Sequence, residues 1–311
     1  MSEHEATGDF SLIPRPSHEL IAPRARGNRI LAGMVEETLA LGREAALSQA
    51  EAEPIIVINL DSLVAEAKRL FDGKGISDGN IRALKLFRQA ADAGHPIAQA
   101  WVGEMYSYNQ GAPQDYAEGF KWYRKSAEQG YISSQYSVGR CYCQGRGVAQ
   151  DYGEAVKWFR KAAEQGYAWG QVSLGLSYER GQGVPQNYAE SVKWYRKAAG
   201  QGNAPGQGKL GWCLHNGQGV AQNYAEAVKW FRKAAEQGYA LGQTSLGLCY
   251  QYGKGVPADM LQAYKWYQLS ADQGDESARQ DVASLADVMS PSELKKAEAL
   301  CREFRDTHPR K

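Results

Sequence analysis

Apolar and polar positions along this chain follow a helical period, and the complete pattern recurs every 36 residues. In the unit 151–186 the first apolar stripe has the three- and four-residue spacing of one helix face, and it comprises Tyr152, Ala155, Val156, Phe159, Ala162 and Ala163. A second helical segment, about 168–180, repeats Leu174, Gly175 and Tyr178 as its inward face. Each unit therefore predicts an αα-hairpin.

The unit is copied in tandem without an insertion. The five full copies occupy 79–114, 115–150, 151–186, 187–222 and 223–258. A half repeat at 59–78 precedes them, and a degenerate repeat at 259–289 follows them. One hairpin cannot bury its apolar face alone, so the tandem copies predict an all-α fold, an α-solenoid of stacked αα-hairpins.

Capping residues and glycines mark the ends of the predicted helices. An Asp or Asn stands before each first helix with a Glu three residues later, as in Asp151 and Glu154. This spacing predicts a capping box, in which the Glu side chain returns to the N–H of the cap residue. A glycine such as Gly166 ends the helix. Gly175 recurs inside the second helix, where glycine costs about 1 kcal/mol relative to alanine, so its recurrence predicts a close approach of two helices.

The segments that flank the repeats differ from them. Residues 1–27 are polar and contain several prolines, which predicts a disordered tail. Residues 28–58 predict an amphipathic helix over about 28–52 and a short extended connector. Residues 290–311 open with a serine cap, a first-turn proline and a glutamate at the third position, which predicts a C-terminal capping helix and a tail.

The repeated motif resembles the Sel1-like repeat, a relative of the tetratricopeptide repeat. Its residues are aromatic-x-Glu-Ala-x-Lys-Trp-aromatic-x-Lys-Ala-Ala-x-x-Gly, followed by Leu-Gly-x-x-Tyr and Gly-x-Gly-Val, over roughly residues 60–287. The resemblance implies a right-handed superhelix that acts as an interaction scaffold or adaptor, and it names no partner. Where the family has alanine near the start of the second helix, this chain has Gly170, Gly206, Gly242 and Ser134, so looser helix starts are expected.

Comparing the copies with one another separates two kinds of position. The packing registers stay constant, whereas five registers of the second helix vary, at offsets 0, +3, +7, +10 and +11 on one helical face. A ligand surface needs different side chains along its length, and Trp, Tyr and Arg are enriched among binding hot spots. The expected partner-binding residues, in a concave groove, are Tyr136, Arg140, Trp169, Leu176, Arg180, Trp212, His215, Leu248 and Tyr252. Two alternative explanations of the variation stay open. The exposed face can change in sequence without selection, or its residues can pack against neighbouring units.

Charge and composition exclude several classes of partner. The 36 basic and 35 acidic residues nearly cancel, which argues against a nucleic-acid surface. Neither a signal peptide nor an apolar run long enough to insert into a membrane is visible. We therefore expect a cytoplasmic protein, a monomer, with export by a specialised route left open.

Other candidate chemistry is weakly supported. The Lys-Trp-aromatic-Arg-Lys run of each unit has its own acids, Glu154 and Glu164, at pairing distance, so a charge-balanced outer face is expected, with Trp158 in inter-repeat packing. Cys141 and Cys143 point to different helix faces and are expected to be small buried side chains. The five histidines form no ligand set, and Gly-x-Gly-Val lacks the Lys-Ser/Thr of a phosphate loop. We expect no catalytic residue, metal or cofactor.

The predicted function is a non-catalytic scaffold or adaptor that binds a protein or peptide. One alternative is a regulatory subunit of an enzyme, or a hydrolase-like enzyme of the same family. The hydrolase-like members carry a cysteine pair in each repeat, which this chain lacks. A second alternative is that residues 28–58 are the docking element and the repeats only display it.

Overall fold

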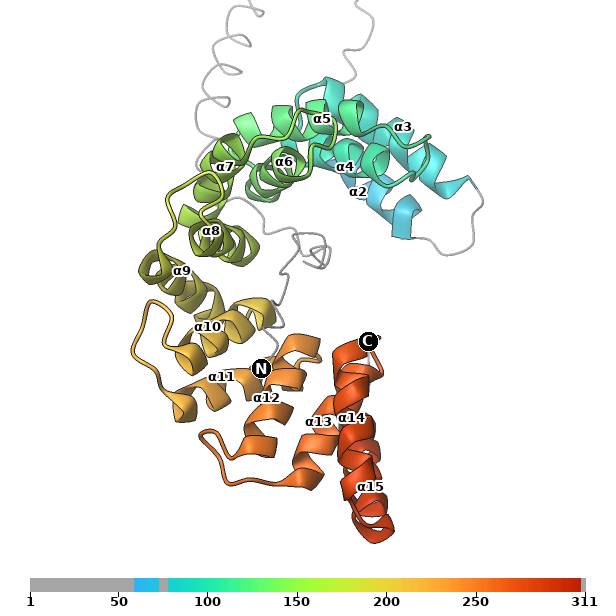
Figure 1. Ribbon diagram of the computed structural model, residues 1–311. Helices are drawn as coiled ribbons and strands as arrows, with labels where there is room; N and C mark the ends of the chain where they lie inside the picture. The colour runs from blue at the N-terminus through green and yellow to red at the C-terminus, as the bar shows by residue number, and fades with distance from the viewer. Residues whose placement is uncertain (1–58, 73–77, 309–311) are drawn as a thin grey trace, which may run out of the picture. The chain divides into compact units, whose positions relative to one another are not determined.

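The computed structural model describes residues 59–72 and 78–308. Within them the chain forms fourteen α-helices and no strand (Figure 1), so the all-α prediction is confirmed. The predicted tail 1–27 and the predicted element 28–58 lie outside the described residues. The helices are α2 (Leu60–Asp72), α3 (Gly79–Asp92), α4 (Pro96–Ser107), α5 (Tyr116–Glu128), α6 (Ile132–Gln144), α7 (Tyr152–Glu164), α8 (Ala168–Arg180), α9 (Tyr188–Gly200), α10 (Ala204–Asn216), α11 (Tyr224–Glu236), α12 (Ala240–Tyr252), α13 (Met260–Ala271), α14 (Glu276–Val288) and α15 (Pro291–Thr307).

The chain divides into two compact units. The described part of the N-terminal unit contains α2 to α5, the first turn of α6 and residues 146–148. The C-terminal unit contains α6 from Tyr136 onward and α7 to α15. Inside this second unit α8 packs on α7 and on α9, and the same neighbour-to-neighbour packing continues to α14. The predicted stack of αα-hairpins is therefore present.

The recurring glycine of each second helix lies against an aromatic ring of the next first helix. A Cβ atom on Gly175 would lie 2.6 Å from Cε1 of Tyr195, closer than real Cβ atoms approach other atoms. Gly211 meets Phe231 in the same way, and both rings are buried. The predicted close approach is confirmed, and it joins α8 to α9 across the intervening loop.

The caps of the first helices form as predicted, but the complete capping box does not. The Asp151 side chain accepts the backbone N–H of Glu154 at 2.9 Å. The Glu154 carboxylate pairs with Lys157 instead of returning to the cap, because the N–H of Asp151 is already bonded to the carbonyl of Tyr142 at 3.0 Å. Equivalent backbone bonds recur at the later caps. The capping-box prediction is therefore wrong here, and each cap is tied to the second helix that precedes it.

The starts of the second helices are closely packed, so the expectation of looser starts is wrong. A Cβ atom on Gly170 would lie 2.9 Å from the Cβ of Ala162, and the glycines of the two later copies make the same contact. In the N-terminal unit the Ser134 hydroxyl donates to the Ser126 hydroxyl at 2.8 Å. Glycine opposite alanine and serine opposite serine both hold the two helices of a hairpin together.

A ladder of paired glutamines, which no motif above predicted, links successive repeats; in each pair the glutamine of the second helix is buried. Gln171 donates from Nε2 to the carbonyl of Ala163 at 3.2 Å and accepts from Nε2 of Gln201 at 2.8 Å. The same amide pairing joins Gln207 to Gln237. These side chains satisfy carbonyls at the ends of the first helices, which lack partners within their own helix.

The first helices carry the predicted charge-balanced outer face. Lys157 pairs with Glu154 one helical turn earlier. The ammonium of Lys161 lies 3.8 Å from the centre of the Trp158 ring, and only 9% of Trp158 is exposed. The indole therefore serves packing, as expected, while the lysine covers its remaining face.

The predicted C-terminal helix is α15. Ser290 and Glu293 form a complete capping box, and the helix packs on α13. Phe304 meets Trp266 edge to face at a centroid separation of 5.1 Å, and Cys301 is buried. The helix thus covers the outer tryptophan of the last hairpin.

Candidate functional site

All nine expected binding residues lie on the second helices of the C-terminal unit. We call the side chains of α6 from Tyr136 onward, α8, α10 and α12 the second-helix surface. Helix α10 contacts both α8 and α12. Near α6, the Tyr136 ring lies 5.4 Å from the ring of Tyr167, the residue before α8. The surface therefore runs across consecutive helices.

One variable register owes its variation to packing and not to a ligand. Tyr136, the member of this register on α6, is fully buried against Tyr167, 31 residues later. Two repeats later, Gly208 occupies this register, because the ring of Tyr239 fills the space that a side chain would need. In the next copy Thr244 donates to Asp275 at 2.8 Å. The residue at this register thus changes together with the residue 31 positions later that packs against it. Tyr136 is a core residue, and its prediction as a residue of an open groove is wrong.

A second variable register is matched to the aromatic residue 16 positions later. Where that aromatic has a hydroxyl, an acceptor faces it: Tyr267 donates to Gln251 at 2.8 Å. Where it is Phe231, the facing residue is His215, with ring centres 6.3 Å apart. The pKa of His215 is lowered mainly by burial, with a further contribution from Lys254. His215 thus belongs first to the packing of α10 on α11.

The remaining expected residues occupy the other three registers. Leu176 is buried, so its side chain is not available to a ligand. Tyr252 is 62% exposed. Few other large apolar side chains in the described residues are exposed. The members that keep exposed surface, which we call the accessible set, are Arg140, Trp169, Arg180, Trp212, Leu248 and Tyr252.

A buried polar cluster within this surface was missed from the sequence. Glu179 accepts the Tyr195 hydroxyl at 2.5 Å and the Lys209 ammonium at 3.1 Å. The side chains of Lys209 and Glu179 are only 8% and 18% exposed. Burial, then the charge of Glu179, raises the pKa of Tyr195 well above its ordinary value, so its hydroxyl stays a donor. The sequence contained one indication of this cluster: Lys209 occupies a register at which the neighbouring copies have Ser173 and Ser245.

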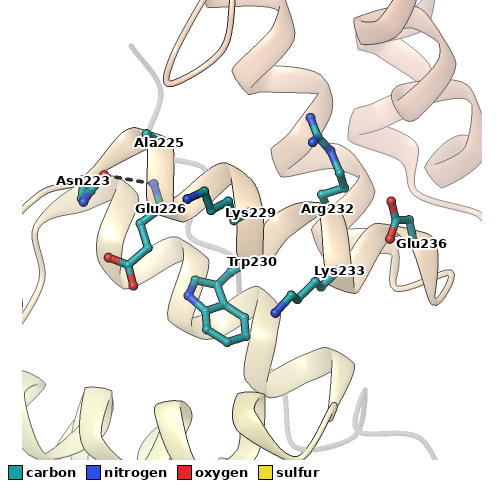
Figure 2. Close-up of a pocket in the computed structure, with 8 residues that line it drawn as sticks. All are labelled: Asn223, Ala225, Glu226, Lys229, Trp230, Arg232, Lys233 and Glu236. Atoms are coloured by element: carbon teal, nitrogen blue, oxygen red, sulfur yellow. Dashed lines mark hydrogen bonds between the residues drawn. The ribbon is translucent and has the colours of Figure 1, made fainter.

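A shallow depression lies on a different face, along α11 (Figure 2). Its volume is about 630 Å³, and its lining comes from this first helix and its cap. Trp230 lines it with Lys233, whose ammonium lies 4.4 Å from the indole ring. Lysine, arginine and glutamate side chains surround the ring, as on the outer face of the other repeats. The depression contains no residue of the accessible set.

The described residues bear on two kinds of catalytic chemistry, metal ions and reactive thiols. They include no group of three or more His, Cys, Asp or Glu that could hold a metal ion. All five cysteines are buried and free, as expected for small core side chains. Burial raises the pKa of Cys143 and of Cys213 to about 12, so neither thiol ionises near neutral pH. In the part of the chain that the structure describes, no helix is long and apolar enough to cross a membrane.

Comparison with known proteins places these features in a family. The Sel1 repeat model matches residues 64–95, 96–131, 132–167, 170–203, 204–239 and 240–275. No curated protein gives a significant match. Among solved structures, the chain is similar to a Sel1 repeat protein from Oxalobacter formigenes, with 28% identity and a TM-score of 0.68 over 80% of this chain and 97% of that chain.

A second solved relative is a protective antigen present in uropathogenic Escherichia coli strains, described as displaying an SLR fold. Its identity is 27% and its TM-score 0.53, over 88% of this chain and 64% of that chain. Most of the family matches start with a second helix and end after the next first helix, as in 204–239, which spans α10 and α11. This is the pair of helices that the interior glycine brings into contact.

Proposed function

Because the chain belongs to the Sel1 repeat family, whose members generally mediate protein–protein interaction, we propose that it is a non-catalytic scaffold. It binds a protein or peptide segment on the second-helix surface of its C-terminal unit. Sel1 folds are typically non-enzymatic, and the protonated buried thiols fit a binding role.

The accessible set is the observation that carries this proposal. Its six residues occupy three registers that vary from copy to copy. Large apolar side chains are costly to keep in contact with water, and drift would replace them with small polar ones. Trp169, Trp212 and Tyr252 nevertheless remain partly or largely exposed. Aromatic and arginine side chains are also the most common anchors of protein interfaces.

Site-specific photocrosslinking tests the proposal. A benzoyl-phenylalanine at position 212 or 252 should crosslink to a discrete partner in native extract, identified by mass spectrometry. The same probe at Lys157 or Lys193, exposed on first helices, is the matched control and should not capture that partner. Equal capture from both faces, or none from either, would contradict the proposed surface.

A substitution then measures the energetic contribution with the purified partner. Trp169→Ala with Trp212→Ala should weaken binding by at least about tenfold, since hot-spot truncations cost about 2 kcal/mol or more. Far-UV circular dichroism should stay unchanged, because the two indoles lie outside the buried core. Undiminished binding by this double variant would remove the surface from consideration.

A further inference from the structure

The positive charge of this chain is concentrated in its middle repeats. Residues 136–258 contain fourteen Lys and Arg against seven Asp and Glu, whereas residues 59–135 contain nine of each kind. Helices α9 and α11 contribute much of the excess, because together they have six basic and three acidic side chains. Both helices pack on α10, so they are neighbours in the layer of first helices. The outer face of this pair is therefore cationic.

Three replacements remove acidic side chains from this pair of helices. The caps of α9 and α11 are Asn187 and Asn223, where α7 has Asp151. Gly200 ends α9 at a register that holds Asp or Glu in the other copies, as Glu164 in α7. A Cβ atom on Gly200 would meet nothing within 4 Å. Packing therefore does not require the glycine, and the missing carboxylate is a property of this part of the surface.

Arg196 of α9 has lost both partners that its register has elsewhere. In α7 the equivalent Arg160 donates to the hydroxyl of Tyr178, 18 residues later, at 2.8 Å. The residue 18 positions after Arg196 is Leu214, which has no hydroxyl, and the residue four positions later is Gly200. Among the described residues Arg196 has no hydrogen-bonding, ionic or aromatic partner, and its side chain is exposed.

Lys229 of α11 is a second exposed cation without an ionic partner. The lysine of this register pairs with the glutamate three residues earlier in α5, α7 and α9, as Lys157 does with Glu154. Within the described part of the chain Lys229 makes no such pair. It lines the depression on α11 together with Trp230 (Figure 2). Trp230 is partly exposed, whereas the four other tryptophans of its register are buried.

The repeat geometry places Arg196 beside this depression. In the N-terminal unit the guanidinium of Arg88 lies 5.7 Å from the centre of the Trp122 ring, which belongs to the next first helix. Arg196 and Trp230 occupy the same two registers, 34 residues apart on consecutive first helices. Arg196 therefore stands on the side of the depression that faces α9. Two cations without counter-charge thus flank one aromatic ring.

We propose that the outer face of α9 and α11 binds an acidic peptide segment of a partner protein, with carboxylates at Arg196 and Lys229 and an apolar side chain on Trp230. A guanidinium matches a carboxylate with two parallel hydrogen bonds, and the indole offers apolar contact. Three glutamates remain on the two helices and would repel a continuous phosphate backbone, which favours a peptide over a nucleic acid. This face is separate from the second-helix surface, so the inference goes beyond the proposed function.

Selection from a library of random short peptides displayed on phage tests the inference on the full-length chain. We expect the natural chain to enrich peptides with Asp or Glu next to an aromatic or aliphatic residue. The charge-reversed variant Arg196→Glu with Lys229→Glu should lose these peptides. If every enriched peptide is retained by the variant, the inference is overturned while binding on the second-helix surface stands. Tighter binding of a short oligothymidylate than of the selected peptides would also overturn it.

Exchanges at Gly200 then measure the contact by fluorescence anisotropy with a labelled selected peptide. Gly200→Glu restores the carboxylate of the other copies next to Arg196, so it should weaken binding by about threefold or more. Gly200→Ala is its control and should leave the affinity unchanged. Undiminished binding by Gly200→Glu would contradict the assigned contact.

Removal of the two cations tests the same contact from the other side. Arg196→Gln with Lys229→Gln should weaken binding by about tenfold, because two exposed charge pairs are lost. The matched control is Arg160→Gln with Lys193→Gln, one repeat earlier, where both cations have partners within the chain. It should leave the affinity unchanged, and circular dichroism should be the same for all variants. An equal loss in the control would overturn the assignment of the site to α9 and α11.

Discussion

Lys209 and Glu179 form a charged pair in the interior of the repeat stack, and removing one partner should be costly. Lys209→Ser introduces the residue that stands at this register in the neighbouring copies, at positions 173 and 245. Glu179 is then left largely buried with only the Tyr195 hydroxyl bond. The converse variant, Glu179→Gln, leaves the Lys209 ammonium buried without its counter-charge. We expect both single variants to be destabilised.

The structure sets the size of the effect. Breaking a buried ion pair by removing one partner costs about 3–5 kcal/mol. Glu179 keeps one hydrogen bond and its side chain is 18% exposed, so Lys209→Ser falls near the lower bound, about 3 kcal/mol. The double variant places a glutamine opposite the Tyr195 hydroxyl, which is the contact that Gln251 makes with the Tyr267 hydroxyl at 2.8 Å. It should cost about 2 kcal/mol or less, since a neutral pair leaves no buried charge.

Urea unfolding followed by tryptophan fluorescence gives the three free energies of a double-mutant cycle. Repeat stacks can unfold in parts, so hydrogen exchange at α9 and α10 provides a local measure. The reasoning predicts that the double variant is more stable than either single variant. A Lys209→Ser cost below about 1 kcal/mol, typical of an exposed pair, or a double variant less stable than both, would refute it.

Three further outcomes are expected. Gly175→Ala should lower the urea midpoint despite its helix propensity, because its Cβ would lie 2.6 Å from the Tyr195 ring and overpacking costs about 1–3 kcal/mol. Gly200→Ala, with nothing within 4 Å of its Cβ, should raise the free energy of unfolding by up to about 1 kcal/mol; a lower free energy of unfolding would contradict the comparison. The pKa of His215 is lowered in the folded protein, so the unfolded chain binds a proton at His215 more readily. The contribution of His215 to stability is therefore complete above its ordinary pKa and declines as the pH falls towards the pKa of the folded state. His215→Gln should flatten the midpoint between about pH 7.5 and about pH 5.5; an unchanged slope would contradict this. A thiol reagent should label none of the five buried cysteines in the native protein at neutral pH and all of them in urea, and rapid native labelling would contradict the described burial.

The repeat pattern predicted the fold well because packing demands the same residues in each copy. The period, the helix ends and the close approach at Gly175 all follow from positions that hold the same or a similar residue in each copy. The capping box was predicted wrongly because the N–H of Asp151 has a partner on another helix, at Tyr142. That carbonyl is nine residues away in the sequence, so the local capping motif does not predict the bond.

The candidate site was predicted less well because variation has two causes. A position can vary for a ligand or because its packing partner varies with it. Tyr136 and His215 belong to the second kind, and recognising them requires knowing which residues meet, such as Tyr136 with Tyr167. Trp169, in another variable register, keeps exposed surface. The sequence identifies the variable registers, but it does not separate those that vary with a packing partner from those that vary for a ligand.

The paired registers determine which piece of this chain could be exchanged for another. Residues 31 or 16 positions apart, such as Tyr136 with Tyr167 and Gln251 with Tyr267, stay together only if the chain is divided before a second helix, as in 132–167 or 240–275. Division at the first-helix caps would separate both kinds of pair. The bond between Lys209 and Glu179 crosses even the better division. The segment 204–239 can therefore be moved or duplicated without loss only behind a neighbour that supplies a carboxylate, which fixes its place in the order of repeats.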